Sequence, residues 1–188
     1  LTRLIEQSAE LFRRYQHYLR LQGHQNTLLN RFDAPSDSSQ YVTQGNFALR
    51  FRALNTARQG DEGGATEMLL ADISRHRELM TAANTLLAKI VSNQAVINDL
   101  TLLNALQAWG LAAPSEAIPA MTQSELGFAA PIAWEFGSYA LLFDDLSENR
   151  NAFSHDFKVP MWVVHSALKK NMFLKQLAQR MDKFIENS

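Results

Sequence analysis

Histidine and carboxylate side chains are the groups in this sequence whose types and spacing could do chemistry. Asp72 and His76 are four residues apart, so a helix would place them on one face, where they could orient an imidazole or supply two metal ligands. A di-metal helical bundle needs Glu-x-x-His motifs, and the sequence contains none, nor a His-Glu-x-x-His motif. We therefore expect an ordinary pair on a helix surface and no metal site.

A second polar cluster combines His155 and Asp156 in an expected loop with His165 on the helix that follows. Histidine titrates near neutral pH, so these side chains could act as acid or base. The neighbouring Ser154 lacks the Gly-x-Ser-x-Gly turn that would expose a nucleophile. Hydrogen bonding within the loop is the favoured interpretation, and we predict no catalytic residue.

Lys89 stands among aliphatic residues and could be a desolvated lysine with a lowered pKa, suited to Schiff-base or general-base chemistry. More commonly, the aliphatic stem of such a lysine covers apolar surface while its ammonium group reaches water or a carboxylate. We favour the second interpretation, with Glu135 or Asp99 as the carboxylate.

Other classes of chemistry lack their motifs. The chain has no cysteine, which removes thiol nucleophiles, disulfides, cysteine-bound zinc and iron–sulfur clusters. Neither the Gly-x-x-x-x-Gly-Lys-Ser/Thr nor the Gly-x-Gly-x-x-Gly phosphate-binding pattern occurs. The sequence therefore predicts no cofactor and favours a binding module over an enzyme.

Charge is nearly balanced, with 18 basic and 19 acidic residues and a net charge of -1. Such a balance argues against nucleic acid as a partner. The charge is unevenly distributed, because residues 1–60 and 151–188 are basic and residues 61–150 are acidic. Packing of the basic ends against the acidic middle is the favoured explanation, and a basic face toward a membrane or polyanion is the alternative.

Apolar residues recur at three- and four-residue spacing along most of the chain, so the elements that must position these groups are helices. The pattern predicts an all-α fold of six or seven helices in antiparallel hairpins, from a bundle to a short α-solenoid, in one domain over residues 1–188. The expected helices are 3–22, a hairpin at 46–80 that turns at Gly60, a buried central helix to Gly110 after a break near 80–84, a helix to about Ser147, and 160–186. A polar loop is expected at 33–39, and Thr122 with Glu125 has the spacing of a capping box.

Aromatic residues are concentrated between 128 and 162, where Trp134, Tyr139 and Trp162 are the most prominent. Their density exceeds what one helix face can bury. They either form the core of the C-terminal half or line a groove that accepts a lipid, a peptide or another subunit.

The hairpin at 46–80 resembles a tetratricopeptide repeat. Counted from Gly60, small residues occupy Ala53 and Ala65, where the two helices of such a repeat approach closely, and Leu69 is apolar where the family has a large residue. Thr56 and Arg77 depart from the aromatic and proline positions of the family. The resemblance implies a helical hairpin of solenoid character.

A broader resemblance covers most of the chain. The Tyr- and Leu-rich first helix, the Phe32–Pro35 loop, the Gly60-Asp61 hairpin, Lys89 among aliphatics and Trp134-Glu-Phe136 are similar to uncharacterised membrane-anchored proteobacterial envelope proteins. The resemblance implies a helical periplasmic domain at the bacterial inner membrane and no particular activity. Because the chain begins at Leu1 rather than Met, we expect a membrane anchor upstream; the alternative location is cytoplasmic.

The sequence thus predicts a non-catalytic interaction or scaffold domain of a bacterial envelope protein that binds a protein partner. The alternative is an apolar small molecule or lipid bound between the long central helix and the aromatic-rich C-terminal helices. A shallow groove with exposed aromatics would favour the first function, and a closed apolar cavity the second. The candidate contact residues are Arg13, Arg14, Trp134, Tyr139, Trp162, His155 and His165.

Overall fold

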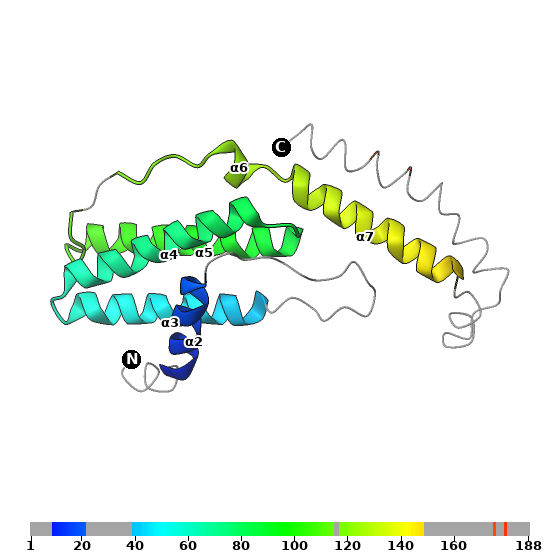
Figure 1. The fold of residues 1–188 in the computed structure, drawn as a ribbon. Helices are drawn as coiled ribbons and strands as arrows, with labels where there is room; N and C mark the ends of the chain where they lie inside the picture. Colours follow the sequence, from blue (N-terminus) through cyan, green and yellow to red (C-terminus); the bar gives the residue numbers. More distant parts are fainter. Residues whose placement is uncertain (1–8, 22–38, 115–116, 149–174, 176–178, 180–188) are drawn as a thin grey trace. The chain divides into compact units, whose positions relative to one another are not determined.

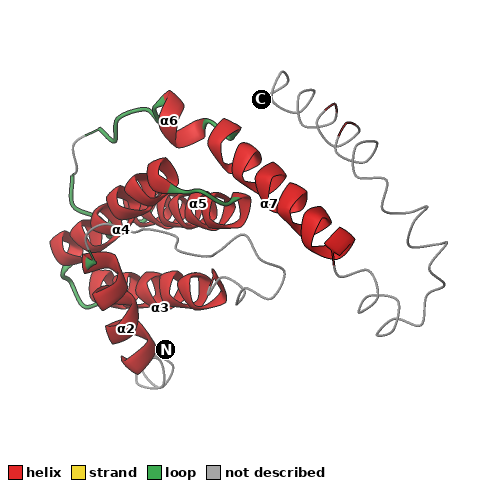
Figure 2. Ribbon diagram, turned by 45° about the vertical axis from the view of Figure 1, so that its right-hand side comes forward, coloured by secondary structure: helices red, strands yellow, loops and turns green. Residues whose placement is uncertain are grey.

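The computed structural model describes residues 9–21, 39–114, 117–148, 175 and 179. Every regular element in this part of the chain is an α-helix, so the predicted all-α fold is confirmed (Figures 1 and 2). The helices are α2 (Ala9–Arg20), α3 (Ser39–Arg58), α4 (Glu62–Ala82), α5 (Leu86–Ala108), α6 (Gln123–Leu126) and α7 (Ala129–Glu148). Two compact units are distinguished: the first holds α2, α3, α4, α6 and α5 from Leu87 onward, and the second holds Asn84–Leu86 and α7.

Helices α3 and α4 form the predicted hairpin and lie against each other along their length (Figure 1). Gly60 makes the turn with a φ of +88°, a conformation that glycine adopts at no steric cost. The Asp61 side chain then caps α4 by accepting a hydrogen bond of 2.8 Å from the Gly64 amide. Ala53 and Ala65 are fully buried, because small side chains let the two helices approach closely.

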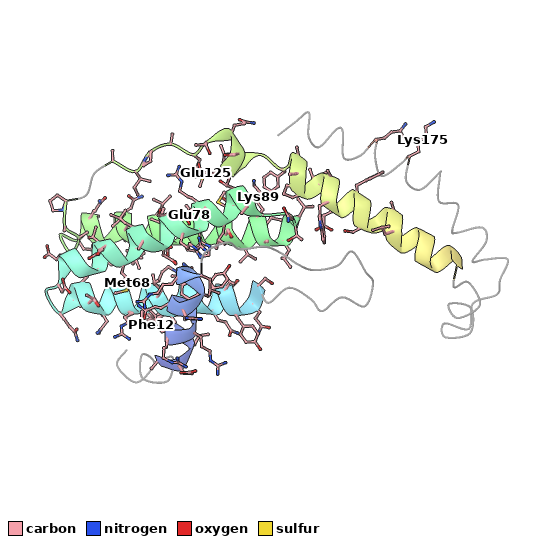
Figure 3. All side chains as sticks on the ribbon, in the orientation of Figure 1. Phe12, Met68, Glu78, Lys89, Glu125 and Lys175 are labelled. Atoms are coloured by element: carbon pink, nitrogen blue, oxygen red, sulfur yellow. The ribbon has the colours of Figure 1, made fainter. Side chains whose placement is uncertain are left out.

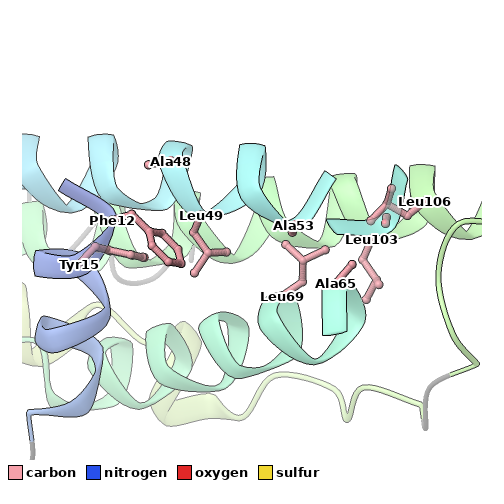
Figure 4. Packing of buried hydrophobic residues seen from close by; sticks show 10 residues of the cluster. Phe12, Tyr15, Ala48, Leu49, Ala53, Ala65, Leu69, Leu103 and Leu106 are labelled. Atoms are coloured by element: carbon pink, nitrogen blue, oxygen red, sulfur yellow. The ribbon is translucent and has the colours of Figure 1, made fainter. Parts of the chain in front are cut away.

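The hydrophobic core of the first unit lies between these helices and includes residues of α2 and α5. Figure 4 shows Leu69 of α4 and Leu103 and Leu106 of α5 among the buried side chains near the turn, while Phe12 of α2 contributes at the opposite end of the cluster. A smaller apolar cluster joins α4 to α5 through Ile73, Met80 and Val96. The larger cluster therefore joins α2 to α3, α4 and α5.

The long helical region breaks where the sequence predicts, since α4 ends at Ala82 and α5 begins at Leu86. The expectation that the central helix is largely buried is wrong for one face of α5. Leu87, Ile90 and Ile97 are each about half exposed, and both charged residues of the helix are buried. Neighbouring helices of the unit cover only one side of α5. The charged residues of α5 lie on that covered side, and its outer face is therefore uncharged and partly apolar.

The connector after α5 is held on α4 by Arg77 and by Thr66, whose Oγ1 accepts a 3.1 Å hydrogen bond from the Ala113 amide. Arg77 donates to both carboxylate oxygens of Glu125, at 2.6 and 3.0 Å, and to the carbonyl oxygens of Pro119 and Ala120. The predicted capping box is present, because the Thr122 amide donates to the Glu125 carboxylate and the Glu125 amide donates to Thr122 Oγ1. These contacts place α6 against α4.

Helix α7 ends at Glu148, close to the predicted Ser147, and carries Pro131 in its first turn, where the missing N–H of proline costs no helical hydrogen bond. Within the second unit, the Glu135 carboxylate accepts a 3.4 Å hydrogen bond from the Leu86 amide. The predicted loops at 33–39 and 149–156 and the predicted helix at 160–186 lie wholly or almost wholly outside the described residues.

Candidate functional site: a buried polar network and an aromatic groove

Five buried polar side chains from four helices form one hydrogen-bonded group, here called the polar network: Tyr15 of α2, Asn46 of α3, Asp72 and His76 of α4, and Asp99 of α5. The Tyr15 hydroxyl lies 2.9 and 3.1 Å from the two Asp72 carboxylate oxygens and 2.6 Å from His76 Nε2. The Asn46 amide donates to Asp72 Oδ2 and Asp99 Oδ1, each at 2.9 Å. The network therefore ties all four helices together.

Gly45 makes room for the network. A Cβ atom built on Gly45 would stand 2.2 Å from Tyr15 Cδ2 and 2.8 Å from Tyr15 Cβ, so the tyrosine lies directly against the backbone of α3. A glycine in the middle of a helix costs about 0.5–1 kcal/mol relative to alanine. The close approach of Tyr15 explains why α3 contains one.

Burial sets the charge of the network. Burial is the main reason why the pKa of Asp99 is raised to about 9, and the neighbouring Asp72 carboxylate adds to this effect. Burial also lowers the pKa of His76, against the opposing effect of Asp72. Near neutral pH, His76 is therefore neutral and Asp99 keeps its proton, so the network avoids holding two buried carboxylate charges side by side.

The network corrects the predicted surface pair of Asp72 and His76. Both side chains are completely buried, as is Asp99, and no substrate in solution can touch them while α2 is in place. Within the described residues, no group of three or more metal-ligating side chains has the geometry to hold an ion. The arrangement suits a structural role, in which hydrogen bonds between buried polar side chains define how four helices meet.

Lys89 is buried as well, and burial lowers its pKa. Its ammonium group donates to the carbonyl oxygens of Met80 at 3.1 Å and Ser124 at 3.0 Å, which links the last turns of α4 to α6 (Figure 3). The carboxylate whose charge opposes the pKa shift is Glu125, which the sequence did not suggest. A lysine with these contacts has the role of a helix-end cap.

A surface feature of different character lies where α2 meets α3. A groove of about 350 Å³ is lined almost entirely by apolar atoms, and we call it the aromatic groove; its residues are Leu11, Thr43, Gln44, Phe47, Ala48, Arg50 and Phe51. The Phe47 and Phe51 rings meet edge to face with centroids 4.6 Å apart. Phe47 is nevertheless 53% exposed, and Tyr41, two residues before the groove on α3, is 68% exposed.

One arginine, Arg50, lines the aromatic groove, and a second arginine of α3 lies on an aromatic ring of α2. The Arg50 guanidinium lies 5.7 Å from the centre of the Phe47 ring, and its Nε atom is buried without a hydrogen-bond partner among the described residues. The Arg52 guanidinium lies 4.6 Å from the centre of the Phe12 ring. The groove thus combines aromatic side chains with one cation, Arg50, which lies over the Phe47 ring.

The structure places some of the contact residues expected from the sequence. Arg13 and Arg14 lie exposed on α2, and both donate to Glu10 at 2.8 Å, which lowers the Glu10 pKa to about 2. Trp134 is partly exposed on α7 in the second unit. The Tyr139 side chain and all of His155, Trp162 and His165 lie outside the described residues.

The sequence predictions missed most of the polar network and the role of the α3 aromatics. Phe47 and Phe51 have core-like spacing, and only the position of α2 decides which of their sides is covered. The interior Gly45 of α3 was the available signal for the close contact with Tyr15. Nothing in the sequence marks Asn46 and Asp99 as partners, because 53 residues separate them.

No family model, curated protein or solved structure matches the chain. The resemblances to tetratricopeptide repeats and to envelope proteins therefore stay predictions. Among the described residues, no helix combines the length and apolar character needed to cross a membrane.

Proposed function

We propose that this chain is a non-catalytic interaction domain that binds a protein partner, and that an amphipathic helix of the partner docks in the aromatic groove. The observation that carries the proposal is the half-exposed Phe47 ring in an apolar groove at the surface of a well-packed helical unit. Amphipathic helices insert apolar side chains at three- and four-residue spacing into grooves of this kind.

The residue types of the groove support a protein partner over a lipid or small molecule. Aromatic residues and arginine are enriched where protein interfaces are fully buried, and a few such anchors carry most of the binding energy. Phe47, Phe51 and Arg50 are of these types, and Thr43 and Gln44 supply a polar rim. An open groove with this composition offers anchors to a partner surface rather than an enclosed space for an apolar ligand.

The polar network supports a binding role in another way. Its titratable groups are buried and hydrogen-bonded to one another, which holds α2 against α3 and α4. Since α2 contributes Leu11 to the groove, the network keeps one wall of the docking surface in place. Preorganisation of this kind lowers the entropic cost of binding.

The proposed location is the periplasmic face of a bacterial inner membrane, on the basis of the resemblance to envelope proteins. A protease-accessibility assay on spheroplasts that contain the natural protein tests this. Digestion in intact spheroplasts is expected, and protection until the cells are lysed would assign the domain to the cytoplasm.

The docking test uses a fluorescein-labelled helical peptide of about 20 residues with leucines at positions i, i+3, i+7 and i+10. Its binding to the 188-residue protein is followed by fluorescence anisotropy. We expect Phe47→Ser to weaken binding at least tenfold, because the substitution removes the central anchor. Ile90→Ser is the matched control, since Ile90 is also 53% exposed but lies on the outer face of α5.

Both variants should melt within a few degrees of the unchanged protein, because both side chains are half exposed. Equal loss of binding in the two variants would point to general hydrophobic adhesion and overturn the assignment of the groove. Equal binding by the Phe47→Ser variant and the unchanged protein, or no binding at all, would also overturn it.

A further inference from the structure

We infer that the partner helix is acidic, with carboxylates beside the apolar residues that enter the aromatic groove. This inference rests on the proposed function and adds the chemistry of the partner. It comes from the charges of the two helices that build the groove, and from how their arginines are held.

The two helices carry a large excess of positive charge. Helix α3 contains Arg50, Arg52 and Arg58 and no acidic residue. Helix α2 contains three further arginines against a single acid, Glu10. Arg13 and Arg14 share that one carboxylate, so their pairing neutralises only part of the charge of α2.

The arginine of the groove wall has an unmatched donor. Arg50 contacts the Phe47 ring with its guanidinium, and its Nε–H is buried without an acceptor among the described residues. A guanidinium held on an aromatic ring keeps its edge available for a planar carboxylate, which can take two parallel hydrogen bonds from it. The Nε atom itself is out of reach of a partner, but the Arg50 side chain is partly exposed, so an incoming Glu or Asp would bind its terminal N–H groups at the edge of the groove.

The same charges argue against a second copy of this chain as the occupant. If two α2–α3 faces met about a twofold axis, each would bring its arginines against those of the other, and like charges across an interface are costly. A helix that presents leucine-type anchors and carboxylates instead satisfies the groove and its rim together.

An anionic membrane would also be attracted by arginines, but the geometry favours a helix. A membrane surface takes up apolar side chains that project from a polar face. Here Phe51 is only partly exposed, and the Phe47 and Phe51 rings are side walls of a groove that also includes Leu11 of a second helix. A recess between two helices fits a row of inserted side chains.

The experiment compares three labelled peptides with the same leucine positions and with Glu, Gln or Lys at the flanking positions. Anisotropy titrations at about 50 and 200 mM salt are made with the 188-residue protein. We expect the Glu peptide to bind at least tenfold more tightly than the Gln peptide, the Lys peptide to bind most weakly, and the preference to shrink at the higher salt.

Variants then assign the preference to the groove. Arg50→Gln should reduce the advantage of the Glu peptide severalfold and leave binding of the Gln peptide nearly unchanged. Arg58→Gln is the control, because Arg58 lies exposed in the last turn of α3 and does not line the groove. Helix content by circular dichroism checks that each variant is folded.

The outcomes separate the two proposals. Equal binding of all three peptides, with sensitivity to Phe47→Ser, would keep the docking groove and overturn the acidic partner. Binding that is insensitive to Phe47→Ser would overturn both. Vesicles of phosphatidylglycerol that bind the protein and displace the Glu peptide, with loss on Arg50→Gln, would replace the acidic helix by a membrane surface.

Discussion

Gly45 and Tyr15 determine together how α2 lies on α3. The tyrosine ring occupies the space in which any other residue at position 45 would place its Cβ, and its hydroxyl ends between Asp72 and His76. The ring cannot move away from α3 without leaving these two partners. One position of α2 therefore allows both the close packing of Tyr15 on the α3 backbone and the hydrogen bonds of its hydroxyl.

Gly45→Ala should destabilise the protein although alanine is the better helix former. Overpacking costs about 1–3 kcal/mol and the gain in helix propensity is about 1 kcal/mol, so we expect a net loss of up to ~2 kcal/mol. Urea unfolding followed by circular dichroism measures it. Gly63→Ala is the control, because the nearest atom to its Cβ is 4.0 Å away; a similar loss in both variants would contradict the account.

The protonated Asp99 makes a pH dependence testable. Its pKa is about 9 in the folded chain against 3.8 ordinarily, so the stability it contributes is fully present below pH ~4 and is lost as the pH rises toward 9. His76 has a lowered pKa, so its effect lies on the other side: stability falls as the pH drops below its ordinary value of 6.5. Above pH 7 the effect of Asp99 on stability can be measured separately, because the effect of His76 lies at lower pH.

Asp99→Asn should flatten the fall in unfolding free energy between pH 7 and 9, because asparagine has no proton to lose. Urea titrations at pH 7, 8 and 9 on both proteins measure this slope. The polar contact with Asn46 is expected to persist in the variant. The same slope in the variant and the unchanged protein would show that Asp99 is already ionised at pH 7.

At the scale of elements, α4 is the helix on which the first unit is assembled. It faces α3 along the hairpin, supplies Asp72 and His76 to the polar network, and holds the 119–125 segment through Arg77. The Arg77 side chain donates hydrogen bonds to Glu125 and to two carbonyl groups at once. Position 77 therefore requires arginine, since only a guanidinium has enough donors in a fixed plane.

Arg77→Lys should loosen the 119–125 segment without unfolding the bundle. A lysine can replace the charge but not the two parallel bonds to Glu125. We expect amide hydrogen exchange in this segment to become about tenfold faster, equivalent to ~1.4 kcal/mol, with little change in α3. Arg58→Lys, on the exposed end of α3, is the control, and faster exchange throughout the bundle would contradict a local role.

Local chemistry explains which parts of the fold the sequence could predict. The Gly60 turn, the break before Leu86 and the Thr122–Glu125 capping box are each specified by a few neighbouring residues, and the structure contains all three. The small residues Ala53 and Ala65 also marked the close approach of α3 to α4 correctly.

Contacts between distant residues could not be predicted in the same way. Periodicity shows that Phe47 and Ile90 lie on apolar helix faces, but it does not show which neighbour covers each face. Both remain half exposed because the covering helices reach only one side of α3 and α5. The same limit applies to Asp72 and His76, whose spacing suggested a surface pair and whose burial depends on Tyr15 arriving from α2.

At the scale of the whole molecule, the uneven charge predicted from the sequence leaves the α2–α3 face basic. The ion pairs of Arg13 and Arg14 stay within the basic N-terminal block, and that of Arg77 stays within the acidic middle block. These pairs therefore do not join basic ends to an acidic middle. Among the described residues, the arginines of α3 form no ion pair, and the proposed acidic helix is based on this charge.

The most direct test of the docking proposal is a map of amide chemical-shift changes when the Glu peptide is added to isotopically labelled protein. We predict that the largest changes fall on Leu11, Thr43, Phe47 and Phe51, and that Ile90 and Ile97 on α5 change little. The largest changes on the α5 face, or changes spread evenly over the first unit, would contradict the assignment of the aromatic groove as the binding site.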